Sequence, residues 1–295
     1  MSYLHIAVVF KASNLNYGEG IGNILSLKKI AVGGKNYSYI SRQALRYDIV
    51  KMLKSMYQYE FAKVDKESGV VQFSEDTTIT DYPEIDLFGY MKTTDSNKIR
   101  KAIVRLTDAT SLEAFHNEID FATNKGLADR IPNNIGNDIF QAEIHKAHYS
   151  YTLTCNLDDI GKDEVYKIEI PQQEKTKRIH ALLDVIKLLY RDIRGKRENL
   201  SPLFVIGGVY DVGNPFFYNR LKIAFTKDKV LLDTNMLNSV VKIKTFDNTV
   251  GEQTSVGYIE GEFNNVEMIN VKNKTDIETF FENLKAKIQR NYGSK

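Results

Sequence analysis

The sequence is poor in the residues that stabilise secreted scaffolds and membrane spans. Among its 295 residues there is one cysteine, Cys155, and no tryptophan. One thiol cannot form an internal disulfide or a thiolate zinc cluster, so we expect a reducing, cytoplasmic location. No apolar run approaches the roughly 20 residues that a membrane-spanning helix needs. The apolar stretch 3–10 follows no basic residue and precedes no small-residue cleavage site, so we expect a strand and no membrane partner.

Charge is unevenly distributed, although the formal net charge is only +2. Residues 1–57 contain eight Lys and Arg against two acidic residues, whereas residues 58–96 contain three basic residues against nine acidic ones. Because phosphate binding depends on the local field, a near-neutral chain can still present a basic face to a nucleic acid. A solvated surface with uneven charge explains the same numbers, and composition alone favours it.

The order of the predicted elements indicates an α+β fold. Two β-prone runs, 25–32 and 37–40, flank Gly33-Gly34 and predict a hairpin. Ser41 is placed to cap a helix that extends to about residue 57, and a second helix is predicted over 176–194, closed by Gly195. Thr275 and Glu278 are spaced as the capping box of a last helix. Further strands are predicted at 3–11, 148–156, 202–210, 220–225, 240–244 and 255–263.

This order resembles a ferredoxin-like core with insertions, an architecture that can hold single-stranded RNA on its sheet face and loops. Many other activities use the same architecture, so the fold alone does not establish a function. The Gly207-Gly208 pair in the 202–210 strand marks either a kink in the core or a place where the backbone approaches RNA.

No motif indicates catalysis, a metal or a cofactor. The string 18–22 is G-x-G-x-G, which lacks the spacing of a dinucleotide fingerprint, and no phosphate-binding G-x-x-x-x-G-K-S/T occurs. The five histidines form neither H-E-x-x-H nor a zinc spacing, and the acids of 58–96 form no calcium-loop pattern. Cys155 alternates with polar residues in an apolar strand, where an inert buried thiol is expected. We therefore predict no catalytic residue, no metal site and no cofactor.

The basic N-terminal quarter carries the strongest binding signal. Basic side chains of the hairpin and of the following helix start can share one face with the helix's N-terminal amides, which are donors suited to phosphate. Neutral side chains nearby suit phosphate, the ribose 2′-OH or base edges. Tyr17, Tyr37 and Tyr39 lie among them as candidates for stacking on bases. The predicted site is Asn16, Lys28, Lys35, Ser41, Arg42, Gln43 and Arg46.

These residues also resemble the N-terminal signature of the CRISPR-associated DevR family, the backbone subunits of type I interference complexes. The resemblance lies in Leu15-Asn16, Gly33-Gly34-Lys35 and the run 39–46, Y-I-S-R-Q-A-L-R, where the family has I-S-S-Q-x-L-K/R. Segments 86–91, 121–130, 148–161 and 202–210 resemble further family blocks in the family's order. Arg42 replaces the motif's second serine, and Tyr17 stands where the family often has a basic residue.

The resemblance implies a modified RNA-recognition-motif core with a helical insertion and a β-hairpin thumb. Residues 1–57 and 148–295 would form the palm core, 58–105 an inserted acidic segment, and 106–147 an insertion containing the thumb. Copies of the chain would stack into a helical filament along the CRISPR RNA, with each thumb kinking the RNA. The other implied partners are the target DNA strand paired to that RNA and the remaining subunits of this antiviral effector complex.

The family's RNA-contacting positions match Asn16, Lys28, Ser41, Gln43 and Arg46. Related type III subunits cut RNA with an aspartate after the first strand, but here that loop offers only Glu19. Type I members lack that activity, which implies a non-catalytic, largely sequence-independent RNA binder. Two alternatives stay open: a repeat-RNA processing endoribonuclease with His148 as general base, and a regulatory RNA-binding protein. We also expect the acidic segment 58–96 to meet the basic patch of the next copy.

Overall fold

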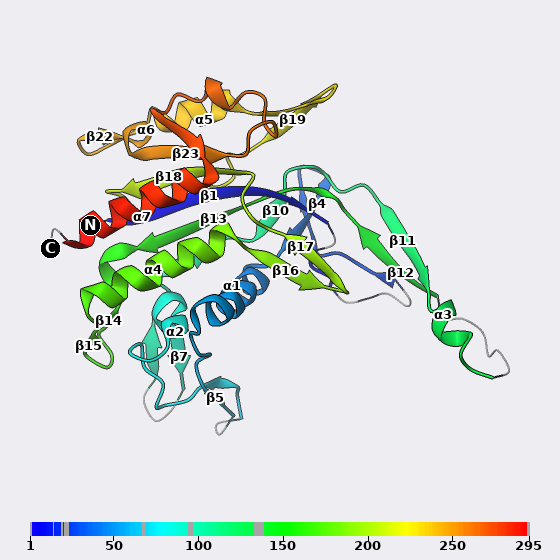
Figure 1. The fold of residues 1–295 in the computed structure, drawn as a ribbon, viewed down its shortest axis with the longest axis horizontal. Helices are drawn as coiled ribbons and strands as arrows, with labels where there is room; N and C mark the ends of the chain where they lie inside the picture. The colour runs from blue at the N-terminus through cyan, green and yellow to red at the C-terminus, as the bar shows by residue number, and fades with distance from the viewer. Residues whose placement is uncertain are drawn as a thin grey trace.

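The computed structural model describes residues 2–13, 15–18, 20, 24–66, 69–93, 97–132 and 139–293. A large sheet runs through its centre in the order β24-β23-β18-β1-β13-β10-β4-β3, and β9 also pairs with β13 (Figure 1). The strands of this sheet are β1 (Tyr3–Ala12), β3 (Lys29–Val32), β4 (Lys35–Ile40), β9 (Val104–Leu106), β10 (Ala109–Ser111), β13 (Ala147–Asn156), β18 (Phe204–Tyr210), β23 (Thr254–Tyr258) and β24 (Asn273–Asp276).

The middle of the sheet has the connectivity of a ferredoxin-like core. Strands β18, β1, β13 and β9 are antiparallel neighbours in that order. In the sequence, α1 (Arg42–Tyr57) lies between β1 and β9, and α4 (Gln172–Lys187) lies between β13 and β18. The resulting order, strand-helix-strand-strand-helix-strand, is that of the split βαβ motif. The predicted α+β class is confirmed.

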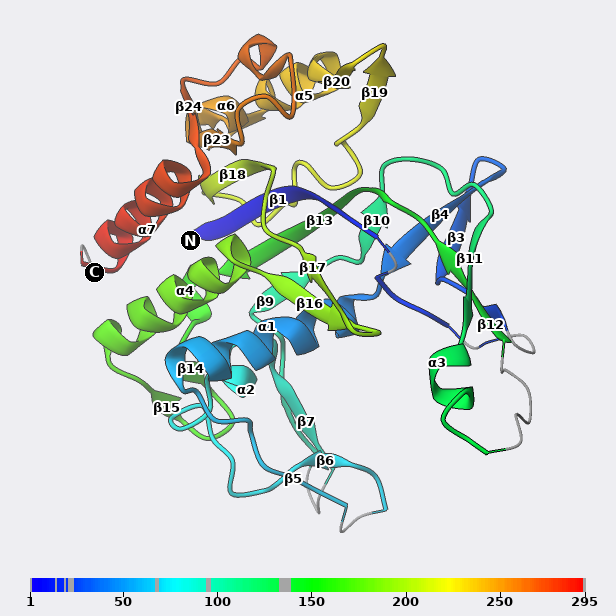
Figure 2. The ribbon, with the colours of Figure 1, turned by 45° about the vertical axis from the view of Figure 1, so that its right-hand side comes forward.

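Both faces of the sheet are covered, because alternate residues of a strand point to opposite faces. Leu4, Ile6 and Val8 of β1 pack into the core beneath α1, α4 and α7 (Ile277–Gly293). The alternate residues Ala7 and Val9 pack into a second core beneath α5 (Thr234–Val241) and α6 (Val250–Gln253). Figures 1 and 2 show the resulting layers, with α5 and α6 on one side of β18 and β1 and with α4 and α1 on the other.

The N-terminal hairpin and helix form as the sequence predicts. Gly33 and Gly34 close the β3–β4 hairpin with φ of 58° and 75°, the double positive φ that a tight hairpin turn requires. Ser41 is the N-cap of α1, and its Oγ accepts a hydrogen bond from the Ala44 amide at 3.4 Å. This hairpin and helix therefore position the residues of the predicted site.

The predicted helix 176–194 is wrong at its end, since α4 stops at Lys187. Residues 190–193 instead form β16 (Tyr190–Ile193), paired with β17 (Lys196–Asn199). Arg194 and Gly195 have φ of 50° and 74°, so Gly195 closes a hairpin turn and is not a helix cap. Gly195 does mark a turn, as predicted, but that turn joins β16 and β17 and does not end a helix.

The predicted strand 240–244 is also wrong. Residues up to 241 lie in α5 (Thr234–Val241), whose N-cap Asp233 accepts a hydrogen bond from the Met236 amide at 3.1 Å. Leu237, Val240 and Val241 are buried at helical spacing, so the apolar pair at 240–241 is the end of a helix face. The predicted cap of the last helix also differs. The Thr279 amide donates a hydrogen bond to the Asp276 carboxylate at 2.9 Å, and Thr275 is not its acceptor.

Shorter elements complete the fold. They are β5 (Val64–Asp65), β6 (Gln72–Phe73), α2 (Pro83–Phe88), β7 (Tyr90–Lys92), β8 (Lys98–Arg100), β14 (Lys162–Asp163), β15 (Ile168–Glu169), β19 (Ile223–Thr226), β20 (Lys229–Leu232), β21 (Lys244–Thr245), β22 (Asn248–Thr249) and α6 (Val250–Gln253).

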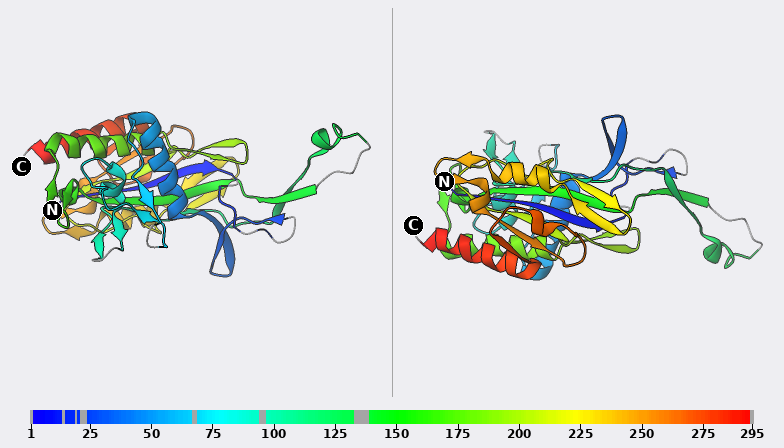
Figure 3. Two further views of the ribbon diagram at one scale, coloured as in Figure 1. Left: turned by 90° about the horizontal axis from the view of Figure 1, so that it is seen from below. Right: turned by 90° about the horizontal axis from the view of Figure 1, so that it is seen from above.

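A long hairpin projects from the end of the sheet (Figure 3). It consists of β11 (Glu118–Thr123) and β12 (Ile139–Ile144), with α3 (Lys125–Ala128) at its far end, and β2 (Ile24–Leu25) pairs with β12. The hairpin is fixed at its base by Glu143, whose carboxylate accepts from the Leu27 amide at 2.7 Å and from Lys29 Nζ at 2.6 Å. We call residues 118–144 the projecting hairpin; residues 133–138 lie outside the described ranges.

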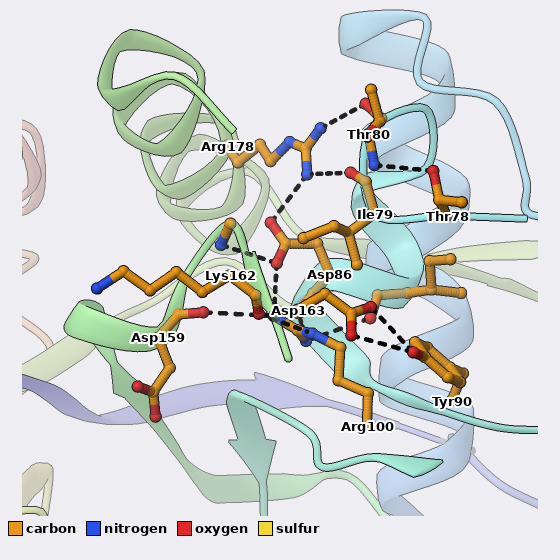
Figure 4. A network of polar contacts seen from close by, with 12 residues as sticks. Thr78, Ile79, Thr80, Asp86, Tyr90, Arg100, Asp159, Lys162, Asp163 and Arg178 are labelled. Carbon is orange, nitrogen blue, oxygen red and sulfur yellow. Dashed lines mark hydrogen bonds and ion pairs between the residues drawn. The ribbon is translucent and has the colours of Figure 1, made fainter. Parts of the chain in front are cut away.

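A buried ion network ties the segment 58–105 to the core (Figure 4). The Asp86 carboxylate is fully buried between Arg100, at 2.8 Å, and Arg178 of α4, at 2.9 Å. Both guanidinium groups also donate to backbone carbonyls, Arg178 to Ile79 and Arg100 to Lys162. Charge pairing of this kind offsets the large cost of burying ions.

Much of the negative charge of 58–96 is neutralised inside the chain. Besides Asp86, four acids of this segment pair with basic residues of the same molecule: Glu60 with Lys54, Glu75 with Lys98, Asp76 with Lys63 and Glu84 with Arg46. Glu67 and Asp95 lie outside the described residues. These pairs leave fewer unpaired carboxylates for the expected contact with the next copy than composition indicates.

Candidate nucleic-acid interface

A groove of about 830 Å³ lies at the start of α1, between β4, the β9–β10 segment and the loop after β18. Its walls combine basic and hydroxyl-bearing side chains with few apolar ones. The lining residues are Lys28, Tyr39, Ser41, Arg42, Gln43, Arg105, Leu106, Thr107, Asp108, Thr152, Thr154, Gly213, Pro215 and Tyr218. A wide groove of this polarity suits a backbone of phosphate and ribose better than an apolar cofactor.

A second groove of about 660 Å³ continues the first along the side of α1. The two share Arg42, Gln43, Arg105 and Leu106, and the second adds Arg46 and Lys101. Together they form one continuous surface, the α1 groove. It gathers five basic residues from three separate parts of the chain: Lys28, Arg42, Arg46, Lys101 and Arg105.

Five of the seven predicted site residues line the α1 groove: Lys28, Ser41, Arg42, Gln43 and Arg46. Arg46 is partly engaged within the chain, with its guanidinium 3.4 Å from the Glu84 carboxylate and 5.1 Å from the centre of the Phe88 ring. Its charge is therefore shared between a carboxylate and a ring face, which leaves less of it for a ligand.

Asn16 and Lys35 lie apart from the lining. Asn16 is buried, and its Nδ2 donates to Ser41 Oγ at 3.2 Å, so it orients the helix cap from behind. Lys35 is exposed beside the hairpin turn and lines neither part of the groove. The structure thus places Asn16 as a support of the groove and Lys35 outside it.

The neighbouring Lys28 and Lys29 side chains make different contacts. Lys29 is directed to the base of the projecting hairpin, where it pairs with Glu143. Lys28 lines the α1 groove, and its backbone is held on both sides: its amide donates to Asn16 O at 2.9 Å, and its carbonyl accepts from the Tyr39 amide at 3.0 Å. Lys28 is therefore presented from a fixed backbone.

Two of the amides at the start of α1 already donate to acceptors within the chain, so these two are not free for phosphate. The Arg42 amide donates to Asp108 Oδ1 at 2.6 Å, and the Ala44 amide donates to Ser41 Oγ. An aspartate at this position satisfies one orphan donor and lies at the positive end of the helix dipole. The basic side chains of the groove are then the main groups suited to phosphate.

Sequence reasoning missed the part of the groove that comes from β9 and β13. Val104 and Leu106 are buried while Arg105 between them is exposed, so a short alternating strand signal was present. Thr107, Thr152 and Thr154 come from paired segments that are far apart in the sequence. Only strand pairing brings these hydroxyls beside Arg42.

Of the three tyrosines considered for base stacking, one lines the α1 groove and two lie outside it. Tyr39 lines the α1 groove. Tyr17 instead packs under Arg194, whose guanidinium lies 5.3 Å from the ring centre, and its hydroxyl donates to Glu143 O at 3.2 Å. Tyr37 lines a neighbouring groove of about 570 Å³ on the same sheet face.

The histidine proposed as a general base is held in place by acids. His148 is buried, with Nδ1 2.8 Å from Glu113 and Nε2 3.0 Å from Glu262. Burial disfavours its charged form, but the two carboxylates outweigh burial and raise the pKa of the imidazole. Both ring nitrogens are engaged, so His148 is not presented to a substrate as a base.

Other reactive groups are also engaged or buried. Burial raises the pKa of the Cys155 thiol well above its ordinary value, as expected for an inert thiol. Burial lowers the pKa of His5 to about 4, and its Nε2 accepts from the Phe217 amide. Within the described ranges, no three His, Cys, Asp or Glu side chains cluster so that they could hold a metal ion.

The two glycines of β18 serve packing. A Cβ on Gly207 would lie 2.1 Å from His5 O, and one on Gly208 would lie 2.0 Å from Gln253 O. Neighbouring backbone therefore requires glycine at both positions. Glu19 and Gly22 of the glycine-rich loop lie outside the described residues.

Comparison with known families identifies the chain. A family model described as "CRISPR-associated negative auto-regulator DevR/Csa2" matches residues 4–231. The chain belongs to this family. The DevR/Csa2 match spans β1, the groove-forming hairpin and helix, the projecting hairpin and β18, so it includes every residue of the α1 groove.

Solved structures share the fold of this DevR/Csa2 member. A chain of a structure titled "CRISPR RNA-guided surveillance complex" matches with a TM-score of 0.62 and 14% identity, over 95% of this chain and 99% of that one. A chain of a "CRISPR RNA-guided surveillance complex, pre-nicking" matches with a TM-score of 0.64 and 12% identity, over 96% and 100%. No curated protein sequence matches.

None of the helices in the described ranges combines the length and the hydropathy that a membrane span requires.

Proposed function

We propose that this chain binds CRISPR RNA without cleaving it, as the repeated backbone subunit of a type I CRISPR interference complex. The observation that carries the proposal is the α1 groove, in which five basic side chains and several hydroxyls surround one continuous surface. Basic groups and hydroxyls bind phosphate and ribose, which every RNA presents, so binding is largely independent of sequence. Membership of the DevR/Csa2 family and the fold shared with surveillance-complex chains support it.

The projecting hairpin supports the repeated, filament-forming role. It exposes large apolar side chains along its length: Ile119, Phe121, Leu127, Ile131, Ile139 and Phe140. Apolar side chains gathered on a projecting arm mark an interaction surface. In this proposal the hairpin is the thumb, which reaches the RNA and the neighbouring copy, while other subunits and the target DNA strand complete the complex.

The test is a series of single-stranded RNAs of increasing length, each mixed with excess protein. We expect the number of bound chains to rise in regular steps with RNA length, because each copy covers a fixed span of backbone. Native mass spectrometry measures the copies per RNA. One bound copy at every length would contradict the backbone role while leaving RNA binding intact.

The family description favours one second candidate, a negative regulator acting outside an effector complex. Such a regulator would recognise a defined target sequence. Binding of several unrelated RNAs with equal affinity would therefore exclude the regulator and support the backbone subunit. The engaged state of His148 gives no support to the endoribonuclease alternative.

A further inference from the structure

The α1 groove contains a carboxylate that an RNA-binding surface must accommodate. Asp108 lies where the α1 groove meets the neighbouring groove of about 570 Å³, and it lines both. Among the lining residues of these grooves, as far as the structure describes them, it is the only acid. A carboxylate repels phosphate, so its place among the basic side chains weakens binding unless it meets a hydrogen-bond donor.

The position of this carboxylate is fixed. Asp108 Oδ1 accepts the Arg42 amide at 2.6 Å, and the residue is exposed. Thr107 beside it is held in turn, because its Oγ1 accepts the Thr152 amide at 2.9 Å. The bond from the Arg42 amide is the only hydrogen bond that Asp108 makes with the described part of the chain, so the acceptor capacity of Oδ2 is unused.

The sugar–phosphate backbone of RNA carries one kind of donor, the ribose 2′-OH, which DNA lacks. A carboxylate that is held beside phosphate-binding groups can accept that hydrogen bond from RNA. A backbone that lacks the 2′-OH offers no such donor, so the carboxylate only repels its phosphates. We propose that Asp108 selects RNA over DNA in the α1 groove by accepting a hydrogen bond from a ribose 2′-OH. This inference rests on the proposed RNA-binding function and assigns its specificity to one residue.

The experiment compares one single-stranded sequence made with three sugars: ribose, 2′-deoxyribose and 2′-fluororibose. The 2′-fluoro sugar keeps an RNA-like shape but has no 2′ donor. We expect the wild-type protein to bind the ribose strand about tenfold more tightly than the 2′-fluoro strand, which corresponds to about 1.4 kcal/mol. Asp108→Ala should bind the two equally, because its affinity for ribose falls while its affinity for both other strands rises.

The expected rise in affinity for the 2′-deoxy and 2′-fluoro strands distinguishes sugar selection from a structural role. Loss of the contact to the Arg42 amide alone would weaken binding to all three strands. Asp108→Asn keeps an acceptor at Oδ1 and a cap for the helix, so it should retain part of the ribose preference. Equal binding of ribose and 2′-fluoro strands by the wild-type protein would overturn the inference and leave RNA binding standing. The three strands are also made in a second base sequence. If Asp108→Ala changed binding for only one of the two sequences, the residue would contact a base, and the inference would be overturned. Failure of the wild-type protein to bind any strand would overturn the proposed function itself.

Discussion

Replacing Asp86 by Asn is expected to lower the free energy of unfolding by about 3–5 kcal/mol. The carboxylate accepts from Arg100 and the Gly161 amide through Oδ1 and from Arg178 through Oδ2. An asparagine amide must turn its NH₂ group toward one of these donors and leaves two buried cations without this counter-charge. Urea denaturation followed by circular dichroism measures the loss.

The matched control is Asp81→Asn, which removes the same charge five residues earlier, at an exposed position. Surface substitutions of this kind stay within about 0.5 kcal/mol of the wild type. If Asp86→Asn changed stability no more than Asp81→Asn does, the network in Figure 4 would not be what joins the segment 58–105 to α4.

Reversing two charges of the α1 groove, in Lys28→Glu with Arg105→Glu, should weaken RNA binding at least about 100-fold, at about 1.4 kcal/mol for each lost contact. The two side chains come from separate segments of the chain that both line the groove. Each phosphate contact on a single strand contributes about 0.7 to the slope of log affinity against log salt, so the slope should fall by about 1.4. Fluorescence anisotropy across a salt series measures both quantities.

Lys244→Glu is the control for this pair, because Lys244 is an exposed lysine of β21, outside the α1 groove. We expect it to change affinity by less than about twofold. Lys35→Glu, at the hairpin turn, tests whether that lysine binds RNA from outside the groove lining. Unchanged affinity in the double variant would remove the α1 groove as the RNA site, even if the protein binds RNA elsewhere.

The sequence predicted well where local signals are strong. Strand β1, the Gly33-Gly34 turn and the Ser41 cap each follow from residues a few positions apart, and all three formed. Gly195 and the apolar pair at 240–241 were misassigned because glycine closes both helices and hairpins, and because a short apolar run suits both strands and helix ends. In both cases the deciding partner, β17 or the Asp233 cap, lay outside the pattern considered.

The groove was predicted only in part, for a similar reason. Lys28, Ser41 and Arg42 are close in sequence, so their clustering was visible. Arg105 and the threonines of β13 join them through strand pairing over long separations, which no local pattern reports. Asp108 was missed because a carboxylate repels phosphate, and only the folded structure shows that it lines the groove and accepts from the Arg42 amide. The contribution of Lys35 and the division into palm, insertion and thumb stay predictions.

Purifying the protein from its host and recovering the RNA bound to it shows whether the protein carries CRISPR RNA. Sequencing and gel electrophoresis of that RNA give its identity and length. We expect RNA of uniform length that contains CRISPR repeat sequence joined to varied guides, and we expect it to be lost in the Lys28→Glu, Arg105→Glu variant. Absence of RNA, or a heterogeneous mixture of cellular RNAs without repeat sequence, would show that the protein does not carry CRISPR RNA.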